Sequence, residues 1–211
     1  MRNLLLLGAG GLAREAAMAE QRSHRIIGIL DDDPQLRGGR IADLDVLGEI
    51  HLAAEHDADL LVCVGSGSAR RTIVRRLAAL GVTDGRYATL TDRAVRIPSS
   101  CVVGVGCIIL AGSVLTADAT IGRHVVLMPN ATVTHDDILE DFVTVAAGAA
   151  LGGSVVLGEA SYLGMNASVR QRVRVGADAT IGMGAAVLED VPSGETWVGV
   201  PARRLAAVRP S

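Results

Sequence analysis

The sequence predicts a chain of two architectures, an α/β unit with a small parallel sheet followed by a parallel β-helix of hexapeptide repeats. Two observations support this fold class. Apolar runs alternate with helical patterns up to about residue 90, as in a parallel sheet with crossover helices. From Ile97 onward, an aliphatic residue returns at every sixth position. A period of six fits neither an α-helix nor a flat strand, and it is typical of a hexapeptide solenoid.

The α/β unit is expected to begin with a buried strand at Leu4–Leu7. Its apolar runs are followed by glycines or acidic residues and then by helical patterns, which is the order of a β/α alternation. The expected strands cover residues 4–7, 26–30, 46–48 and 60–64. The expected helices lie near residues 49–55 and 69–80, after a first helix that ends near Glu20.

The turn after the first strand matches the nucleotide-binding fingerprint G-x-G-x-x-A at Gly8, Gly10 and Ala13, with Asp31 about twenty residues on. Glycines at these positions let the backbone approach a phosphate, and the helix N-terminus supplies N–H donors. A full dinucleotide fold needs a second half, whereas here the α/β pattern ends near residue 90. The turn therefore favours a nucleotide sugar or a similar phosphate ligand over NAD, with a purely structural turn as the alternative.

The hexapeptide repeat runs without an insertion from Ile97 to Val187. Three hexads make one triangular coil, so the repeat predicts about five coils, each of which buries its faces on its neighbours. The column four residues after each aliphatic position holds small or β-branched residues, except at Asp137. A buried carboxylate is costly unless it is hydrogen-bonded or protonated, so the coil is expected to distort locally at Asp137.

Composition excludes several classes of protein. The net charge of −3 and the lack of a Lys/Arg cluster argue against a nucleic-acid or anionic-membrane partner. The first apolar run is too short for a signal peptide, and no stretch approaches the ~20 apolar residues that span a bilayer. The three cysteines form neither an even disulfide framework nor a paired metal spacing. We therefore expect a reduced, cytoplasmic protein.

The chain resembles the left-handed β-helix acyltransferases and, more closely, the bacterial sugar O- and N-acetyltransferases of the NeuD and PglD type. The resemblance covers nearly the whole chain. It rests on the hexads and on four segments: Gly8-Ala9-Gly10-Gly11, Leu30-Asp31-Asp32-Asp33, Thr134-His135-Asp136 and Trp197-Val198-Gly199-Val200-Pro201-Ala202-Arg203. It implies a Rossmann-like nucleotide-sugar-binding domain at residues 1–92, a left-handed β-helix that binds acetyl-CoA at 93–192, a C-terminal cap at 193–211, and a homotrimer.

The resemblance also implies the catalytic and cosubstrate-binding residues. His135 matches the catalytic histidine, and because it follows an inward position by two residues it is expected on an outer turn, where a neutral imidazole can accept a proton. Asp136 matches its acidic partner. Gly153, one coil later, matches the backbone donor to the acetyl carbonyl. Arg203 or Arg204 is expected to meet the CoA phosphates, unless this segment only caps the prism.

The acceptor, a sugar or nucleotide sugar, is expected at the glycine-rich turn and the following aspartates, namely Gly8, Gly10, Gly11, Asp31 and Asp32. Three positions depart from the residues that many relatives carry. Met128 stands in place of Asn, and Thr144 and Leu12 each stand in place of His. Asp137 is an alternative to Asp136 as the group that orients the histidine.

A metal site is not expected. Zinc carbonic anhydrases also use a β-helix, but they need three convergent histidines, and the positions five and thirty-six residues before His135 are Asn130 and Ser99. The other histidines are expected at the surface; they are His24, His51, His56 and His124.

The resulting hypothesis is an acetyl-CoA-dependent acetyltransferase that acts on an amino or hydroxyl group of a sugar, with His135 as general base. The sequence does not separate N- from O-acetylation. One alternative is a non-catalytic, trimeric nucleotide-sugar-binding or scaffold protein, which the departures at Met128, Thr144 and Leu12 favour. Another is an NAD-linked oxidoreductase, which predicts NAD binding and no release of thiol.

Overall fold

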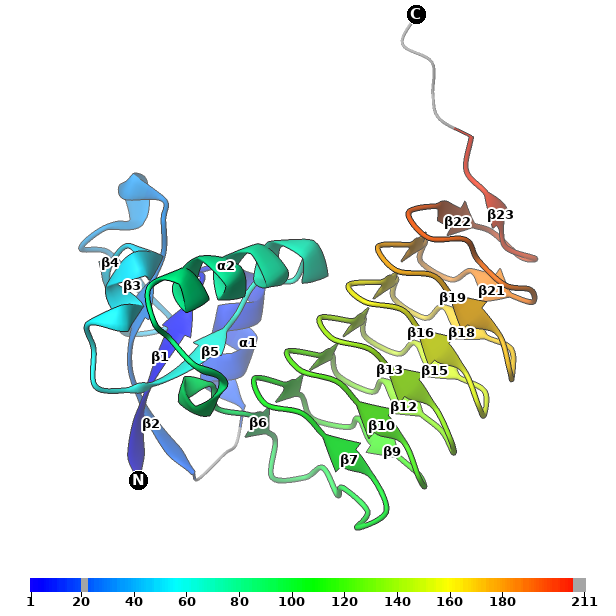
Figure 1. Cartoon of the computed structure of the whole chain (residues 1–211), viewed down its shortest axis with the longest axis horizontal. Helices are drawn as coiled ribbons and strands as arrows, with labels where there is room; N and C mark the ends of the chain where they lie inside the picture. The colour runs from blue at the N-terminus through cyan, green and yellow to red at the C-terminus, as the bar shows by residue number, and fades with distance from the viewer. Residues whose placement is uncertain (20–22, 207–211) are drawn as a thin grey trace, which may run out of the picture.

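The computed structural model describes residues 1–19 and 23–206. Glu20, near which the first helix was expected to end, lies outside them, as do residues 207–211 of the expected cap. The chain forms an α/β unit and a prism of stacked coils, and the α/β unit lies beside the first coils (Figure 1). Both architectures expected from the sequence are confirmed. Within the described residues, no helix is both long and apolar enough to cross a membrane.

The α/β unit is a five-stranded sheet in the order β3-β4-β2-β1-β5. All neighbouring pairs are parallel except β3 with β4. Its strands are β1 (Arg2–Leu7), β2 (His24–Leu30), β3 (Arg40–Ile41), β4 (Leu44–Gly48) and β5 (Asp59–Val62). Its helices are α1 (Gly11–Met18), α2 (Gly67–Ala79) and the 3₁₀ turns η1 (Pro34–Leu36), η2 (Ile50–Ala54) and η3 (Asp84–Arg86). The helix expected near 49–55 is therefore the 3₁₀ turn η2.

Both faces of this sheet are covered, which is why the apolar run of β1 is continuous rather than alternating. Leu4 and Leu6 pack in a cluster with α1 and with the first coils of the prism. Leu5 and Leu7 pack on the opposite face in a cluster with α2 and η2. The chain leaves β1 for β2 on one side and returns to β5 on the other, so the carboxyl ends of β1 and β5 form a topological switch point.

The prism is the expected left-handed parallel β-helix, built from two-residue strands on three faces. The β7 face contains β7 (Val102–Val103), β10 (Thr120–Ile121), β13 (Ile138–Leu139), β16 (Val156–Leu157) and β19 (Arg174–Val175). The β9 face contains β9 (Val114–Leu115), β12 (Thr132–Val133), β15 (Ala150–Leu151), β18 (Ser168–Val169) and β21 (Ala186–Val187). The β8 face contains β6 (Leu90–Thr91), β8 (Ile108–Ile109), β11 (Val126–Leu127), β14 (Thr144–Val145), β17 (Tyr162–Leu163), β20 (Thr180–Ile181), β22 (Thr196–Val198) and β23 (Arg203–Arg204).

Successive coils stay in register at eighteen residues, as the pairing of Ile138 with Thr120 and with Val156 shows. The aliphatic residue of each hexad points inward and joins one continuous core. Aliphatic and small residues fill this narrow interior, and Trp197 packs against its far end. The strand β6, within the span expected for the first domain, already pairs with β8 of the prism, and β22 and β23 extend the same face into the expected cap.

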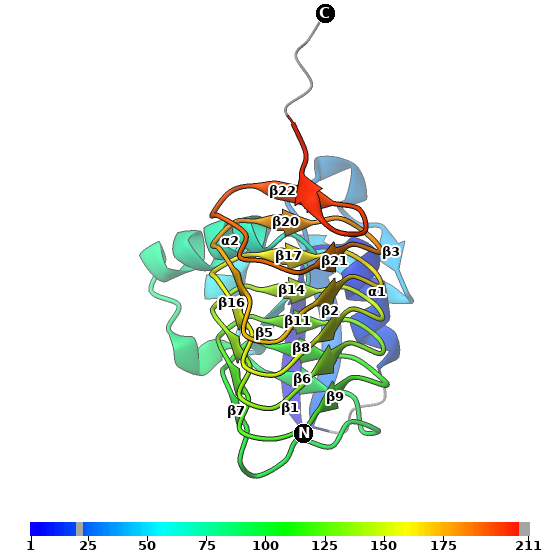
Figure 2. The same ribbon diagram turned by 90° about the vertical axis from the view of Figure 1, so that its right-hand side faces the viewer.

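The β8 face of the first coils holds the α/β unit, with α1 and α2 on opposite sides of the central stack of strands (Figure 2). The side chain of Arg70, in α2, is completely buried at this junction. It donates to the carbonyls of Val64 and Gly65 in its own unit and to those of His124, Phe142 and Val143 in the prism, and also to the Thr144 hydroxyl. Burial lowers the pKa of Arg70 to about 10, so the guanidinium is still charged at neutral pH.

The surface position expected for His124 is wrong, because its side chain is only 1% exposed. Its ring stacks on Phe142 at 5.2 Å and meets Tyr87 edge-on at 4.7 Å. Neither ring nitrogen has a hydrogen-bond partner. Burial, with the nearby cation of Arg70, lowers the pKa of His124 to about 4, so the imidazole is neutral at physiological pH. Of the other histidines, His51 is exposed, whereas His24 and His56 are half-buried.

Candidate active site

The turn between β12 and β13 carries the polar pair His135 and Asp136. Both side chains point to solvent, with 64% of His135 and 59% of Asp136 exposed. Asp136 has a φ of 61°, in the left-handed region that aspartate tolerates better than most residues. This turn geometry lets two adjacent side chains lie together, which an extended strand would prevent.

The carboxylate of Asp136 contacts the ring of His135 at 2.8 Å, between Oδ2 and Nδ1. An ionised carboxylate can only accept a hydrogen bond, so Nδ1 carries the proton and donates it. The other ring nitrogen, Nε2, is then unprotonated in the neutral imidazole and can accept a proton from a substrate. The partner of the histidine in this structure is thus Asp136 rather than the alternative, Asp137.

Gly153 lies one coil further along the same edge, directly against the ring of His135. A Cβ at this position would collide with Cε1 and Nε2 of the imidazole, so any larger residue would push the His135 ring out of this position. The next residue, Ser154, donates its backbone N–H to the His135 carbonyl at 2.9 Å. Within the described residues the Gly153 N–H donates no hydrogen bond of its own. A free backbone donor therefore lies beside the imidazole, an arrangement that can stabilise an oxyanion.

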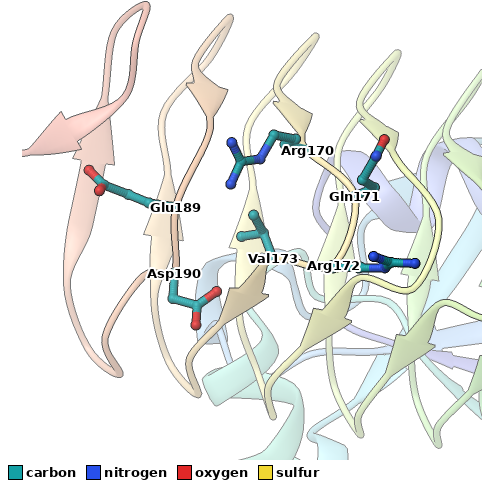
Figure 3. Close-up of a pocket in the computed structure, with 6 residues that line it drawn as sticks. All are labelled: Arg170, Gln171, Arg172, Val173, Glu189 and Asp190. Atoms are coloured by element: carbon teal, nitrogen blue, oxygen red, sulfur yellow. The ribbon is translucent and has the colours of Figure 1, made fainter.

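The same edge is hollowed further along the prism (Figure 3). The hollow has a volume of about 570 Å³ and is lined by Arg170, Gln171, Arg172, Val173, Glu189 and Asp190. Gln171 lies two coils after His135 in the same column, so the hollow begins roughly 10 Å from the histidine at one strand spacing per coil. Arg170 and Arg172 are exposed and, among the described residues, form no ion pair. Sequence reasoning missed these two arginines because they sit in ordinary hexads with no motif around them.

Arg203 and Arg204, the arginines expected to meet CoA, are both engaged with carboxylates. Arg203 lies 3.0 Å from Glu189, and Arg204 lies 3.2 Å from Glu195. Their strand β23 is antiparallel to β22 and closes the β8 face. The structure therefore brings neither guanidinium to the histidine turn as a free cation.

The glycines of the turn after β1 differ in whether their surroundings leave room for a side chain. Gly8 has a φ of 102°, and a Cβ there would lie 2.7 Å from the side chain of Val64, so glycine is required where the segment after β1 packs on the segment after β5. Gly10 precedes α1 as its N-cap, and a Cβ there would meet no atom within 4 Å. Gly11 begins α1 and is exposed. The open side of the turn is therefore at Gly10 and Gly11, where the unpaired N–H groups of a helix start can hold an anion.

The aspartates after β2 organise this same edge of the sheet. Asp31 accepts the backbone N–H of Ala9 at 2.7 Å and that of Asp33 at 2.8 Å. Asp32 accepts the N–H of Ile50 and pairs with Arg76 of α2 at 2.7 Å. Burial raises the pKa of Asp32, but the hydrogen bonds from Arg76 and Ile50 outweigh this effect and lower the pKa. Asp31 thus holds the glycine-rich turn in place, while Asp32 ties β2 to α2.

Two of the departures from the family pattern lie in the interior of the fold, and the third packs against it. Leu12 is 7% exposed and packs in the cluster under α1, and Met128 packs against that cluster. Thr144 is 3% exposed, and its hydroxyl accepts from Arg70 and donates to the Gly65 carbonyl. These residues are explained by how the α/β unit attaches to the prism. Within the described residues, no group of three or more metal-ligating side chains is close enough to hold a metal ion.

Comparison with known proteins identifies both parts of the chain. Residues 3–77 match the family model of the PglD N-terminal domain. The acetyltransferase domain of PglB from Neisseria gonorrhoeae, solved in complex with acetyl coenzyme A, is 32% identical with a TM-score of 0.88. That match covers 97% of this chain and 99% of the other.

Two further structures match over 97% of this chain. PerB from Caulobacter crescentus, solved in complex with CoA and GDP-perosamine, is 26% identical over 97% of its own chain, with a TM-score of 0.85. WeeI from Acinetobacter baumannii is 24% identical over 100% of its chain with a TM-score of 0.81, and it supports the fold alone. Each of these matches spans the α/β unit and the prism together.

Proposed function

The chain belongs to the NeuD/PglD-type sugar acetyltransferases and is an acyltransferase that uses acetyl-CoA, and we propose that it acetylates a nucleotide-linked sugar with His135 as general base. The observation that carries this proposal is the exposed His135–Asp136 pair, bonded at 2.8 Å, with the free N–H of Gly153 beside its ring. Base, orienting carboxylate and oxyanion donor then occupy one edge of the prism.

The proposed reaction is direct transfer, with no covalent enzyme intermediate. The amino or hydroxyl group of the sugar attacks the thioester carbonyl carbon, and the new C–N or C–O bond forms as the C–S bond breaks. His135 accepts the proton of the attacking group at Nε2 and returns it to the departing CoA thiolate. The Gly153 N–H stabilises the oxyanion, and Asp136 holds the ring in the required tautomer.

We propose that the hollow beyond His135 receives the phosphates of CoA. Arg170 and Arg172 provide two free cations there, and the side chain of Arg172 extends toward the preceding coil (Figure 3). The carboxylates in the hollow are partly occupied, since Glu189 pairs with Arg203 and Asp190 accepts the N–H of Arg174. Arg203 then contributes by neutralising Glu189, which is a smaller role than the direct contact expected from the sequence.

For the acceptor, we propose that the nucleotide lies over the turn at Gly10 and Gly11, beside Asp31 and Asp32, at the switch point of the sheet. The support is the open helix start at Gly10 and the bound GDP-perosamine in PerB. In this proposal, residues 1–92 bind the nucleotide, residues 93–192 bind acetyl-CoA, and residues 193–211 form the cap of the prism.

We further propose a homotrimer. The edge that carries His135 separates the β7 and β9 faces, and both expose apolar residues: Val102 is 62% exposed, Val114 47% and Ile138 44%. A second prism against one of these faces would cover this surface and supply the wall that the open hollow lacks. Sedimentation should give three times the mass of one chain, and a monomer at micromolar concentration would contradict the proposal.

The decisive experiment is an acetyl-CoA assay with a panel of nucleotide-linked amino and neutral sugars, in which free thiol is measured together with the mass of the product. We expect thiol release that depends on the sugar and an added acetyl group on it. NAD binding without thiol release would support the oxidoreductase alternative. Sugar-nucleotide binding without transfer would support the scaffold, although buried Leu12 and Thr144 no longer argue for it.

A pair of glycine variants tests the acceptor site. Gly10→Val places its side chain in open space above the helix start, so it should leave the melting temperature unchanged and weaken nucleotide-sugar binding. Gly8→Val is the control, because its side chain would collide with Val64 and should lower the melting temperature. If Gly10→Val binds the nucleotide sugar normally, the turn is structural.

A further inference from the structure

Asp137 is a carboxylate inside the prism, directly beneath the candidate active site. Its side chain is completely buried, in a column that elsewhere holds small or β-branched residues such as Ala119 and Val155. Burial raises the pKa of Asp137, against the effect of its backbone hydrogen bonds. A buried carboxylate costs free energy that alanine would not, so its presence calls for a reason other than core packing.

The carboxylate takes hydrogen bonds that the regular coil would make with its own backbone. Its Oδ2 accepts the Thr134 N–H at 2.7 Å. One coil earlier and one coil later, the equivalent N–H groups of Thr116 and Gly152 donate instead to carbonyls of the next coil. The Leu151 carbonyl, which Thr134 would reach in that pattern, accepts from the Thr134 hydroxyl at 3.0 Å.

The other oxygen acts in the same way on the following coil. Oδ1 accepts the Val155 N–H at 2.8 Å. One coil on, the equivalent N–H of Val173 closes its turn on the Arg170 carbonyl. Asp137 therefore joins the turn of His135 to the turn of Gly153 by its side chain.

The rung between these two turns, the step from the β12 coil to the β15 coil, is open in the sense that one of its backbone pairs is missing, while the Ser154 N–H still donates to the His135 carbonyl. Strands β12 and β15 pair through Thr132 and Ala150 alone, without the second pair that Val133 and Leu151 would make. The neighbouring rungs on the same face, β9 with β12 and β15 with β18, each pair two residues. The local distortion expected at Asp137 is thus confirmed, and it lies between the base and the oxyanion donor.

We propose that Asp137 is a positioning residue that holds this rung open and thereby sets the separation of the His135 imidazole from the Gly153 N–H. This inference rests on the proposed function of these two groups. The carboxylate touches neither substrate nor the imidazole ring, and it acts through the backbone of both turns. Displacement of a catalytic group by about 1 Å can cost up to about 100-fold in rate. A small movement of the His135 turn relative to the Gly153 turn is therefore sufficient to lower the rate.

The test is Asp137→Ala in the full chain, which restores the residue found at Ala131 and Ala149 in the same column. We expect the missing backbone pair to form and kcat to fall about 10-fold or more. The KM for acetyl-CoA should not change, and the melting temperature should stay the same or rise. Asp137→Asn, which keeps one carbonyl acceptor, should recover part of kcat. The matched control is Ser113→Ala, which removes another hydrogen-bonding group of this column, the donor to the Met128 carbonyl, and should leave kcat within about twofold.

Rung closure is read independently of activity, from the crystal structure of Asp137→Ala or from hydrogen exchange at Thr134 and Val155. The inference is overturned if Asp137→Ala keeps near-full kcat, if the rung stays open without the carboxylate, or if Asp137→Ala and Asp137→Asn both fail to fold. Failure of the proposed function looks different: the wild-type chain would then transfer no acetyl group, or His135→Ala would retain full turnover.

Discussion

The prism contains two histidines, His124 and His135, on turns of the same repeat, and the fold gives them opposite environments. His124 is 1% exposed under the α/β unit, with no polar partner for its ring. His135 is 64% exposed on an uncovered edge, with Asp136 on one ring nitrogen and the other free. In a solenoid, therefore, the chemistry available to an outer-turn residue depends on what covers that edge. One histidine serves packing and the other is available for proton transfer.

The largest effect should separate these two histidines. His135→Ala removes the proposed base and should lower kcat by ~10²–10⁴-fold, with an unchanged melting temperature, because no core cavity is made. His124→Ala removes a packed ring and should lower the melting temperature while kcat per folded molecule is retained. Steady-state kinetics and thermal unfolding of both variants measure these opposite effects on kcat and on the melting temperature. The variant His51→Ala, at an exposed position, is the control. Equal losses of activity in both would contradict the comparison.

The second effect concerns the attachment of the covered region. Arg70→Met keeps the apolar stem but leaves several buried carbonyls without a donor, so the free energy of unfolding should fall by about 3 kcal/mol or more. Arg75→Met, on the exposed side of the same helix, should cost less than about 0.5 kcal/mol. Denaturant titration of both variants provides the measurement. A loss at Arg70 no larger than at Arg75 would show that the junction does not depend on the buried guanidinium.

The third effect is a pH dependence specific to the covered histidine. The pKa of His124 is about 4 when folded and near 6.5 when unfolded, so the unfolded chain binds more protons between these values. The contribution of the neutral His124 to the free energy of unfolding should therefore be fully present above pH 6.5. It should be lost as the pH falls toward 4, by about 3 kcal/mol in total.

The comparison of wild type with His124→Phe isolates this contribution to stability. The buried Asp137, whose pKa is raised, changes stability in the opposite sense in acid and is common to both proteins. Unfolding free energies from pH 4 to 7 provide the measurement. If His124→Phe loses as much stability in acid as the wild type does, the buried imidazole is not the group responsible.

The smallest effect lies along the uncovered edge. Arg170→Ala and Arg172→Ala should each raise the KM for acetyl-CoA roughly 10-fold, since a charge-assisted contact contributes about 1.5 kcal/mol, and kcat should change little. Arg174→Ala, on the adjacent β7 face and outside the hollow, is the matched control. If Arg203→Ala raises this KM more than either hollow arginine does, the CoA phosphates lie at the C-terminal strand instead.

Much of the fold could be predicted because the hexapeptide period is a local property that repeats. Each aliphatic position had only one consistent place, facing the interior, and the structure has it buried there from Ile109 to Val187. The turn of His135 follows from the same count, as does the approach of Gly153 after eighteen residues. The expected helix at 49–55 is shorter and of the 3₁₀ type, and it covers Ile50–Ala54 between β4 and β5.

The sequence by itself determined the repeat, the inward and outward positions, and the candidate base on an outer turn, because each depends on periodicity and local turn geometry. Only the tertiary structure decided which outer turns are covered. It buried His124 and Thr144 under α2, brought Arg70 onto carbonyls more than fifty residues away, and left the edge with Arg170 open. The reason is that docking of the α/β unit on the β8 face is a long-range packing event, and no spacing within a hexad encodes which edge it covers.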